Sequence, residues 1–153
     1  PLLAHVDAWQ WRPDLIWFDN FRTIGTANYY VQKMFSTHRG TQVIPAFSAG
    51  KPLIGADSLY ASAVIDKSDS KVYIKIVNVS GSAKSILLNL EGASFSKAGE
   101  IETLKAKGLY EFNSISNPEN IIPVSKPLSV PGKKLTVSLD PSSVNVITLP
   151  LRK

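Results

Sequence analysis

Hydrophobic and polar residues alternate along much of the chain after residue 50. The clearest stretch runs from residue 71 to 79, where Val72, Ile74 and Ile76 share one face. Side chains two residues apart in a strand point to the same side, so this pattern predicts a strand with a core-facing apolar surface. Lys75 lies on the opposite face, where replacement by Ala is expected to cost little stability. Similar runs predict further strands at residues 59–65, 85–90, 100–104, 134–139 and 144–149.

Turn-forming residues separate these strands. Residues 66–70 read Asp-Lys-Ser-Asp-Ser and predict a polar turn, and Asp-Pro-Ser-Ser at 140–143 predicts a hairpin between the last two strands. The stretch 93–131 holds several prolines and one strand-like run, so we expect a long surface excursion there. Short strands with regular turn signals predict a mainly β fold, an antiparallel β-sandwich of the jelly-roll kind.

The first part of the chain has a different pattern. Residues 14–19 are mostly apolar without alternation, as in a strand covered on both faces. Thr26 is a good N-cap, and apolar residues at helical spacing follow it, so residues 26–36 should be helical, with Gly40 shortly after the end. One β/α unit cannot cover both faces of its strand, so its neighbours are either missing from this chain or supplied by another segment. We therefore divide the chain into a terminal β/α unit, 1–42, and a β-sandwich domain, 43–153.

Composition excludes several classes of function. The chain is 44% hydrophobic and 19% charged, and no apolar run is long enough to span a membrane. It has no cysteine, and its two histidines, His5 and His38, have no arranged carboxylate partners, so no metal site is expected. The net charge is +5, but the lysines are spread along the chain, which argues against nucleic-acid binding. The first residues already belong to a run of apolar and aromatic residues, so we expect the chain to begin at a boundary within a longer protein.

Chemistry-bearing motifs are scarce. No nucleophile elbow, phosphate loop, dinucleotide fingerprint or histidine triad is present. Asn78-Val79-Ser80 matches a glycosylation sequon, a triplet that also arises by chance. Most of the 12 carboxylates lie in polar turns, whereas Asp19 ends an apolar strand just before a loop. In barrel enzymes a residue at this position faces the active site. The alternative is that Asp19 or Asn20 caps the strand-to-loop turn.

Residues 5–45 carry a family resemblance. The segment HVDAWQWRPDLIWFDNFRTIGTANYYVQKMFSTHRGTQVIP resembles the last barrel strand and last helix of the α-L-arabinofuranosidases of glycoside hydrolase family 51. NPENIIPV at 117–124 and LDPSSVNVITLPL at 139–151 resemble the end of the family's C-terminal sandwich more loosely. The resemblance implies a fold in which the sandwich is preceded by the last strand and helix of a (β/α)8 barrel.

The resemblance also implies a function. Family members remove terminal arabinofuranosyl groups from plant polysaccharides with retention, using two glutamates about 5–5.5 Å apart and no cofactor. Both glutamates lie on upstream barrel strands, and none of the 5 glutamates here matches either motif. We thus expect a structural C-terminal fragment with no catalytic residue and no hydrolytic activity of its own. Its partners would be the rest of the barrel and, through the complete enzyme, an arabinose-containing saccharide. The polysaccharide substrates favour a secreted or periplasmic location.

By position, Asp19 or Asn20 resembles the family's polar residue at the mouth of the last barrel strand, so both are candidate substrate-binding residues. Trp9 and Trp11 either form a pocket wall or, as we favour, pack between barrel and sandwich. The alternative function is a carbohydrate-binding module, which needs an exposed aromatic platform. We consider it weaker because the chain has no Trp after residue 50 and the other aromatic residues there lie mostly at positions suited to burial, namely Tyr60, Tyr73, Phe95, Tyr110 and Phe112.

Overall fold

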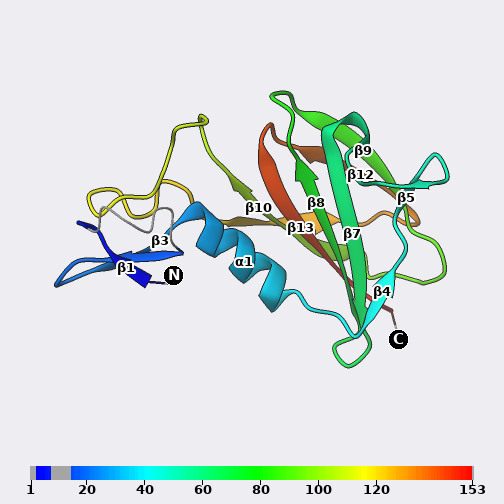
Figure 1. Cartoon of the computed structure of the whole chain (residues 1–153). Helices are drawn as coiled ribbons and strands as arrows, with labels where there is room; N and C mark the ends of the chain where they lie inside the picture. The colour runs from blue at the N-terminus through cyan, green and yellow to red at the C-terminus, as the bar shows by residue number, and fades with distance from the viewer. Residues whose placement is uncertain (1–2, 8–14, 153) are drawn as a thin grey trace.

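The structure, a computed structural model, describes residues 3–7 and 15–152. This part of the chain is mainly β, with one α-helix and one short 3-10 helix (Figure 1). The elements are β1 Leu3–His5, β2 Ile16–Phe18, β3 Thr23–Gly25, α1 Ala27–Thr37, β4 Gln42–Ile44, β5 Phe47–Ser48, β6 Lys51–Pro52, η1 Ala56–Ser58, β7 Leu59–Asp66, β8 Lys71–Asn78, β9 Lys84–Asn89, β10 Ala98–Lys105, β11 Val124–Ser129, β12 Lys134–Leu139 and β13 Ser143–Pro150. Every strand expected from the alternation is present.

The N-terminal elements form a small unit at one end of the molecule (Figure 1). Strand β2 lies between β1, to which it is parallel, and β3, to which it is antiparallel. Helix α1 follows β3 directly, and the Thr26 hydroxyl accepts a hydrogen bond from the Tyr29 backbone N–H at 3.3 Å, as expected for an N-cap. The predicted helix is therefore confirmed.

The sandwich, by which we mean strands β4–β13, is built on one six-stranded antiparallel sheet of order β11-β10-β13-β8-β7-β4. The pair β9–β12 covers one face of this sheet. The main core lies between these two layers, where alternate residues of the facing strands are buried, among them Ile76, Leu139 and Ile147. The antiparallel sandwich predicted from the alternation is thus confirmed, with one layer much wider than the other.

Helix α1 covers the opposite face of the six-stranded sheet. Met34 of the helix is buried against Leu104 of β10 and Val146 of β13, together with Ile121 from the loop before β11. Beyond the helix, Gly40 passes so close to β7 that a Cβ there would lie 2.7 Å from the Ile65 carbonyl oxygen, so only glycine fits without a shift. The terminal β/α unit therefore shares a core with the sandwich.

The hairpin predicted between the last two strands is wrong. Strand β12 pairs with β9, whereas β13 pairs with β8 and β10, so residues 140–143 carry the chain from one layer to the other. Turn chemistry determines where the chain reverses, but the core determines which strand lies beside which.

The surface excursion predicted for residues 93–131 is also wrong in part. The segment contains β10, an inner strand of the large sheet, and β11, which lies at its edge. It also buries Leu104, Asn113, Ile121 and Val130. Strand β11 was hidden in the sequence because it contains Pro127, a residue that sheets accept only at edges or bulges.

The expected burial of the later aromatic residues is correct for Tyr73, which is buried, but wrong for three others. Tyr110 is 94% exposed, and Phe112 and Tyr60 are also exposed. Tyr110 and Phe112 lie in the connection between β10 and β11, where no regular element covers them. A composition argument cannot distinguish an aromatic residue on a projecting loop from one in a core.

Candidate functional site

The turn that follows β2 contains the two candidate substrate-binding residues, Asp19 and Asn20. Asp19 closes this turn with both its backbone and its side chain. Its backbone N–H donates to the Arg22 carbonyl at 2.9 Å. Its Oδ1 accepts hydrogen bonds from the backbone N–H groups of Phe21 and Arg22 at 2.8 and 2.7 Å. The capping role considered for Asp19 is therefore observed.

An ion pair completes the turn. Asp19 Oδ2 accepts from Arg22 Nη2 at 3.0 Å and from Nε at 3.3 Å. The pKa of Asp19 is lowered, first by the hydrogen bond from the Phe21 N–H; partial burial opposes this shift, and the contacts with Arg22 reinforce it. The carboxylate is ionised at neutral pH, and both of its oxygens are used within the turn.

The turn also touches a distant part of the chain. Arg22 Nη1 donates to the Ile115 carbonyl at 3.3 Å, and Asn113 Nδ2 donates to the Gly25 carbonyl at 2.8 Å. Asn113 is buried and also exchanges hydrogen bonds with the backbone of Ile121. The β10–β11 connection therefore runs along β3, from its end at Gly25 towards the turn. Our sequence reasoning missed Asn113, since an asparagine in a proline-rich stretch has no periodic context.

The tip of the turn is open to solvent. Asn20 is exposed, and Phe21 is 91% exposed although it is a large apolar residue. Trp9 and Trp11, the candidates for a pocket wall, lie outside the described residues, as does Asp14. The two residues at the tip of this closed turn thus present an amide and an aromatic ring to solvent.

Three of the five glutamates, Glu91, Glu100 and Glu102, belong to the strands and turns of the sandwich, whereas Glu111 and Glu119 lie in the β10–β11 connection that runs along β3. Glu102 of β10 is the most enclosed: its Oε2 is buried without a hydrogen bond, 3.9 Å from Nδ1 of His38 at the end of α1. The His38 ring also packs edge-on to Tyr73, and its Nδ1 lies 2.7 Å from the Met34 carbonyl oxygen. This cluster is packed between the end of the helix and the sheet, and the His38 and Glu102 side chains are each 23% exposed.

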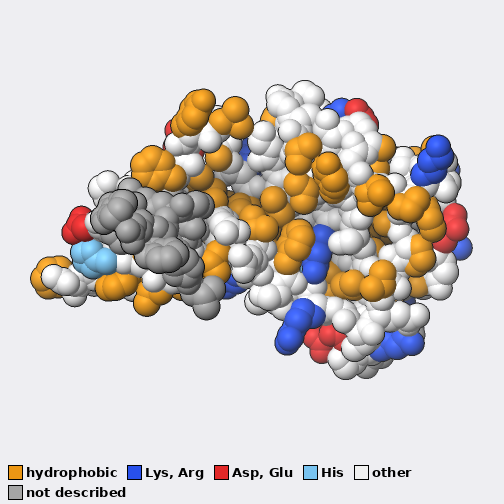
Figure 2. Space-filling view, in the orientation of Figure 1, with side chains coloured by type: hydrophobic (Ala, Val, Ile, Leu, Met, Phe, Trp, Pro, Cys, Tyr) orange, Lys and Arg blue, Asp and Glu red, His pale blue; other side chains and the backbone are white. Residues whose placement is uncertain are grey.

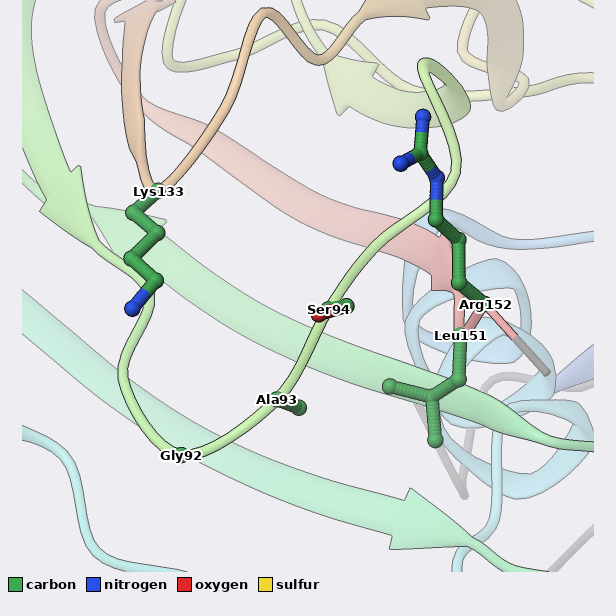
Figure 3. Close-up of a pocket in the computed structure, with 6 residues that line it drawn as sticks. All are labelled: Gly92, Ala93, Ser94, Lys133, Leu151 and Arg152. Atoms are coloured by element: carbon green, nitrogen blue, oxygen red, sulfur yellow. The ribbon is translucent and has the colours of Figure 1, made fainter.

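A shallow pocket of about 510 Å³ lies at the opposite end of the sandwich. It is lined by Gly92, Ala93, Ser94, Lys133, Leu151 and Arg152 (Figure 3). The charged ends of Lys133 and Arg152 point in different directions, on either side of the segment that contains Ser94 (Figure 3). The pocket contains none of the predicted site residues.

Within residues 3–7 and 15–152, no group of three or more metal-ligating side chains is close enough to hold an ion. No helix in the same residues is long and apolar enough to cross a membrane. Asn78 of the sequon is completely buried, so a glycan could not be attached to it in the folded chain.

Comparisons with known proteins identify the family of this chain. Residues 1–143 match the profile of the α-L-arabinofuranosidase C-terminal domain. α-L-Arabinofuranosidase 1 of Arabidopsis thaliana is 29% identical over 155 residues, which cover 97% of this chain and 22% of that protein. An extracellular exo-α-L-arabinofuranosidase of Streptomyces chartreusis is 48% identical over 52 residues, or 34% of this chain and 6% of that protein.

Solved structures give the same result. The arabinose-bound MgGH51 α-L-arabinofuranosidase superposes with a TM-score of 0.88 at 30% identity, over 99% of this chain and 23% of that one. An α-L-arabinofuranosidase from Thermotoga maritima shares the fold, with a TM-score of 0.74 at 18% identity. The superposition covers 88% of this chain and 31% of that one. The chain spans about a fifth of the length of the Arabidopsis relative. It belongs to the family of α-L-arabinofuranosidase C-terminal domains, as the resemblance of residues 5–45 implied.

Proposed function

We propose that this chain is the C-terminal part of a retaining α-L-arabinofuranosidase that removes terminal arabinofuranosyl groups from plant polysaccharides. In this proposal residues 1–42 complete the catalytic barrel and residues 43–153 form the sandwich that supports it. The observation that carries the proposal is the family match over residues 1–143. In addition, 97% of this chain aligns with only 22% of the Arabidopsis relative.

The N-terminal unit supports this assignment. Strands β1–β3 are only three residues each, and a sheet of that size buries too little surface to be stable alone. The parallel pair β1–β2 with the helix α1 resembles the end of a (β/α)8 barrel, although β3 occupies the other edge of β2 as an antiparallel neighbour. The upstream barrel would then pair with the free edge of β1 and bury the half-exposed strands.

The chain itself would be structural. Barrel enzymes place catalytic residues at the carboxyl ends of their strands, and the described turn after β2 carries no glutamate. The two catalytic glutamates would therefore come from upstream strands. Asp19 and Asn20 would lie at the mouth of the last strand, and Asn20 is better suited to contact sugar because the Asp19 oxygens already accept hydrogen bonds within the turn.

The test uses the complete enzyme that contains this chain. It should hydrolyse an aryl α-L-arabinofuranoside, and proton NMR of the first product should show the anomeric configuration of the substrate, because a covalent intermediate inverts the centre twice. Release of the inverted anomer would overturn the retaining mechanism. An absence of arabinose release would overturn the proposed activity.

A second function, carbohydrate binding by the sandwich itself, is favoured by one observation. Tyr110 and Phe112 are exposed on the same connection, and aromatic faces pack well against the C–H faces of sugars. Titrating this chain with labelled arabinan separates the two functions. Saturable binding that is lost in Tyr110→Ala would establish a binding module, whereas a structural domain should show no saturation.

A further inference from the structure

The most exposed feature of the N-terminal unit is the turn between β2 and β3. This turn projects away from the sandwich at the far end of the molecule (Figure 1), and the outermost side chains there are apolar (Figure 2). Phe21 lies in the turn and is 91% exposed. A ring in this position is left with almost no packing partner among the described residues, so it is available to contact something else.

The backbone beneath Phe21 is held firmly. Asp19 accepts a hydrogen bond from the Phe21 N–H, and the Asp19–Arg22 ion pair closes the turn around it. Arg22 in turn donates to the Ile115 carbonyl, which ties the turn to the sandwich. A preorganised aromatic side chain loses little conformational entropy when a ligand packs on it, since only its two side-chain torsions have to be ordered.

The position of the turn indicates the ligand. Under the proposed function, on which this inference rests, β2 is a barrel strand and its carboxyl end faces the substrate side of the enzyme. The exposed amide of Asn20 lies beside Phe21 and can exchange hydrogen bonds with sugar hydroxyls. An apolar ring next to a polar amide suits a sugar, which has an apolar C–H face and a rim of hydroxyl groups.

We propose that Phe21 is a specificity-determining residue whose ring packs on a main-chain sugar of the polysaccharide, next to the arabinofuranosyl group that is cleaved. The turn projects from the end of β2, so its tip suits the rim of the pocket better than the floor, where the terminal arabinofuranosyl group must sit. The ring would therefore contribute to the binding of polymeric substrates and contribute little to that of small arabinosides.

The test compares two substrates of the complete enzyme, an arabinosylated polysaccharide and methyl α-L-arabinofuranoside, whose leaving group has no ring to stack. In Phe21→Ala, the ratio of kcat/KM for the polysaccharide to kcat/KM for the methyl glycoside should fall about five- to tenfold, mainly through KM. Phe21→Tyr keeps the ring and should retain the ratio. Tyr60→Ala removes an exposed ring on β7 and serves as the matched control, with no change expected.

Each remaining outcome overturns the assignment. An unchanged ratio in Phe21→Ala means that the ring does not contact the main chain. Equal losses on both substrates together with a lowered melting temperature mean that the ring packs against the upstream part of the enzyme. If the unmodified enzyme releases no arabinose from either substrate, the proposed function fails, and a wild-type assay reveals this before any variant is made.

Discussion

At the residue scale, buried asparagines hold the chain reversals of the sandwich. Asn78 at the end of β8 is completely buried, and its Nδ2 donates to the carbonyl oxygens of Ser82 and Asp140, both at 2.9 Å. Its Oδ1 accepts from the Ser80 backbone N–H at 3.1 Å. One side chain thus joins the turn after β8 to the crossing between β12 and β13. Buried polar groups are tolerated when all their hydrogen bonds are made, as they are here.

Replacing Asn78 by Ala should therefore be costly. The change removes the hydrogen bonds that the Asn78 amide makes to the backbone of Ser80, Ser82 and Asp140 and empties a fully buried position, so the free energy of unfolding should fall by about 2–3 kcal/mol. Asn89→Ala is the matched control: Asn89 is exposed on β9, and the loss there should stay within about 0.5 kcal/mol. Urea denaturation of the three proteins measures both values, and equal losses would show that the Asn78 network contributes nothing specific.

How far single residues can be predicted from the sequence depends on their neighbours. Val72, Ile74 and Ile76 were correctly assigned to the core because a repeated pattern surrounds them. Asn113 and Tyr110 lie where no pattern exists, so the sequence indicated neither the burial of the asparagine nor the exposure of the tyrosine. At Asp19 the sequence predicted a functional or a capping residue. Only the structure shows that its carboxylate accepts hydrogen bonds from the backbone N–H groups of Phe21 and Arg22 and from the Arg22 guanidinium.

At the element scale, both faces of β8 are covered. Ile74 and Ile76 point into the main core, whereas Lys75 lies on the face under α1. Its Nζ donates to the Phe35 carbonyl at 3.0 Å and lies 4.9 Å from the centre of the Phe35 ring. Burial lowers the pKa of Lys75. The alternation in β8 could not reveal that this helix covers its second face, because Phe35 lies 40 positions away from Lys75 in the sequence.

Substitutions on the two faces of β8 should differ in cost. Ile76→Ala, and likewise Ile74→Ala, should lower the free energy of unfolding by about 2–4 kcal/mol because each leaves a cavity in the main core. Lys75→Ala should cost about 1 kcal/mol, more than the negligible loss expected from the sequence, because it removes the contacts with Phe35. Thermal and urea unfolding test the order. Equal losses at Ile76 and Lys75 would contradict the assigned faces.

The β7–β8 hairpin should make stability depend on pH. The pKa of Asp66 is lowered, first by the hydrogen bond from the Ser68 hydroxyl and then by those from the backbone N–H groups of Asp69 and Ser68. A lowered pKa in the folded state means that the turn stabilises the protein above the unfolded pKa of about 3.9, and that this contribution disappears as pH falls through the lower folded value. The stability difference between wild type and Asp66→Asn should therefore be largest near neutral pH and shrink towards pH ~2. A difference that grows on acidification would refute this linkage.

The elements themselves were easier to predict than their partners. Strand β8 and helix α1 follow from local periodicity, which every residue of the element reinforces. The pairing of β12 with β9, and of β13 with β8 and β10, depends on contacts between segments far apart in sequence, which periodicity does not encode. For the same reason the sequence indicated a candidate site at the end of β2 but did not indicate the contact of this turn with the loop around Ile115.

At the scale of the whole molecule, the N-terminal unit and the sandwich are joined in two places. Helix α1 packs Met34 into a core cluster with Leu104, Ile121 and Val146. The β10–β11 connection adds the hydrogen bonds of Asn113 and Arg22 along β3. These contacts hold the last barrel strand of the proposed enzyme against the sandwich. Under the proposed function, they would let the sandwich hold the mouth of the active site in place.

The isolated chain should have no hydrolytic activity. A retaining glycosidase needs two carboxyl groups on either side of one anomeric carbon, and the loss of either commonly costs several orders of magnitude in turnover. None of the glutamates in this chain lies at the end of a barrel strand, so the purified chain should hydrolyse no aryl α-L-arabinofuranoside above the enzyme-free blank. Measurable turnover that survives rigorous purification would disprove the absence of a catalytic pair.

In the complete enzyme, Asp19→Ala then separates the two roles considered for this residue. If Asp19 contacts the substrate, turnover or substrate affinity should fall while the melting temperature stays within a few degrees. If it only closes the turn, stability should fall and activity should follow the amount of folded protein. The hydrogen bonds from Phe21 and Arg22 lead us to expect the second outcome for small arabinosides. For the polysaccharide we expect an additional loss, because the turn that presents Phe21 is no longer held in place. Identical losses on both substrates would show that the turn carries no specificity.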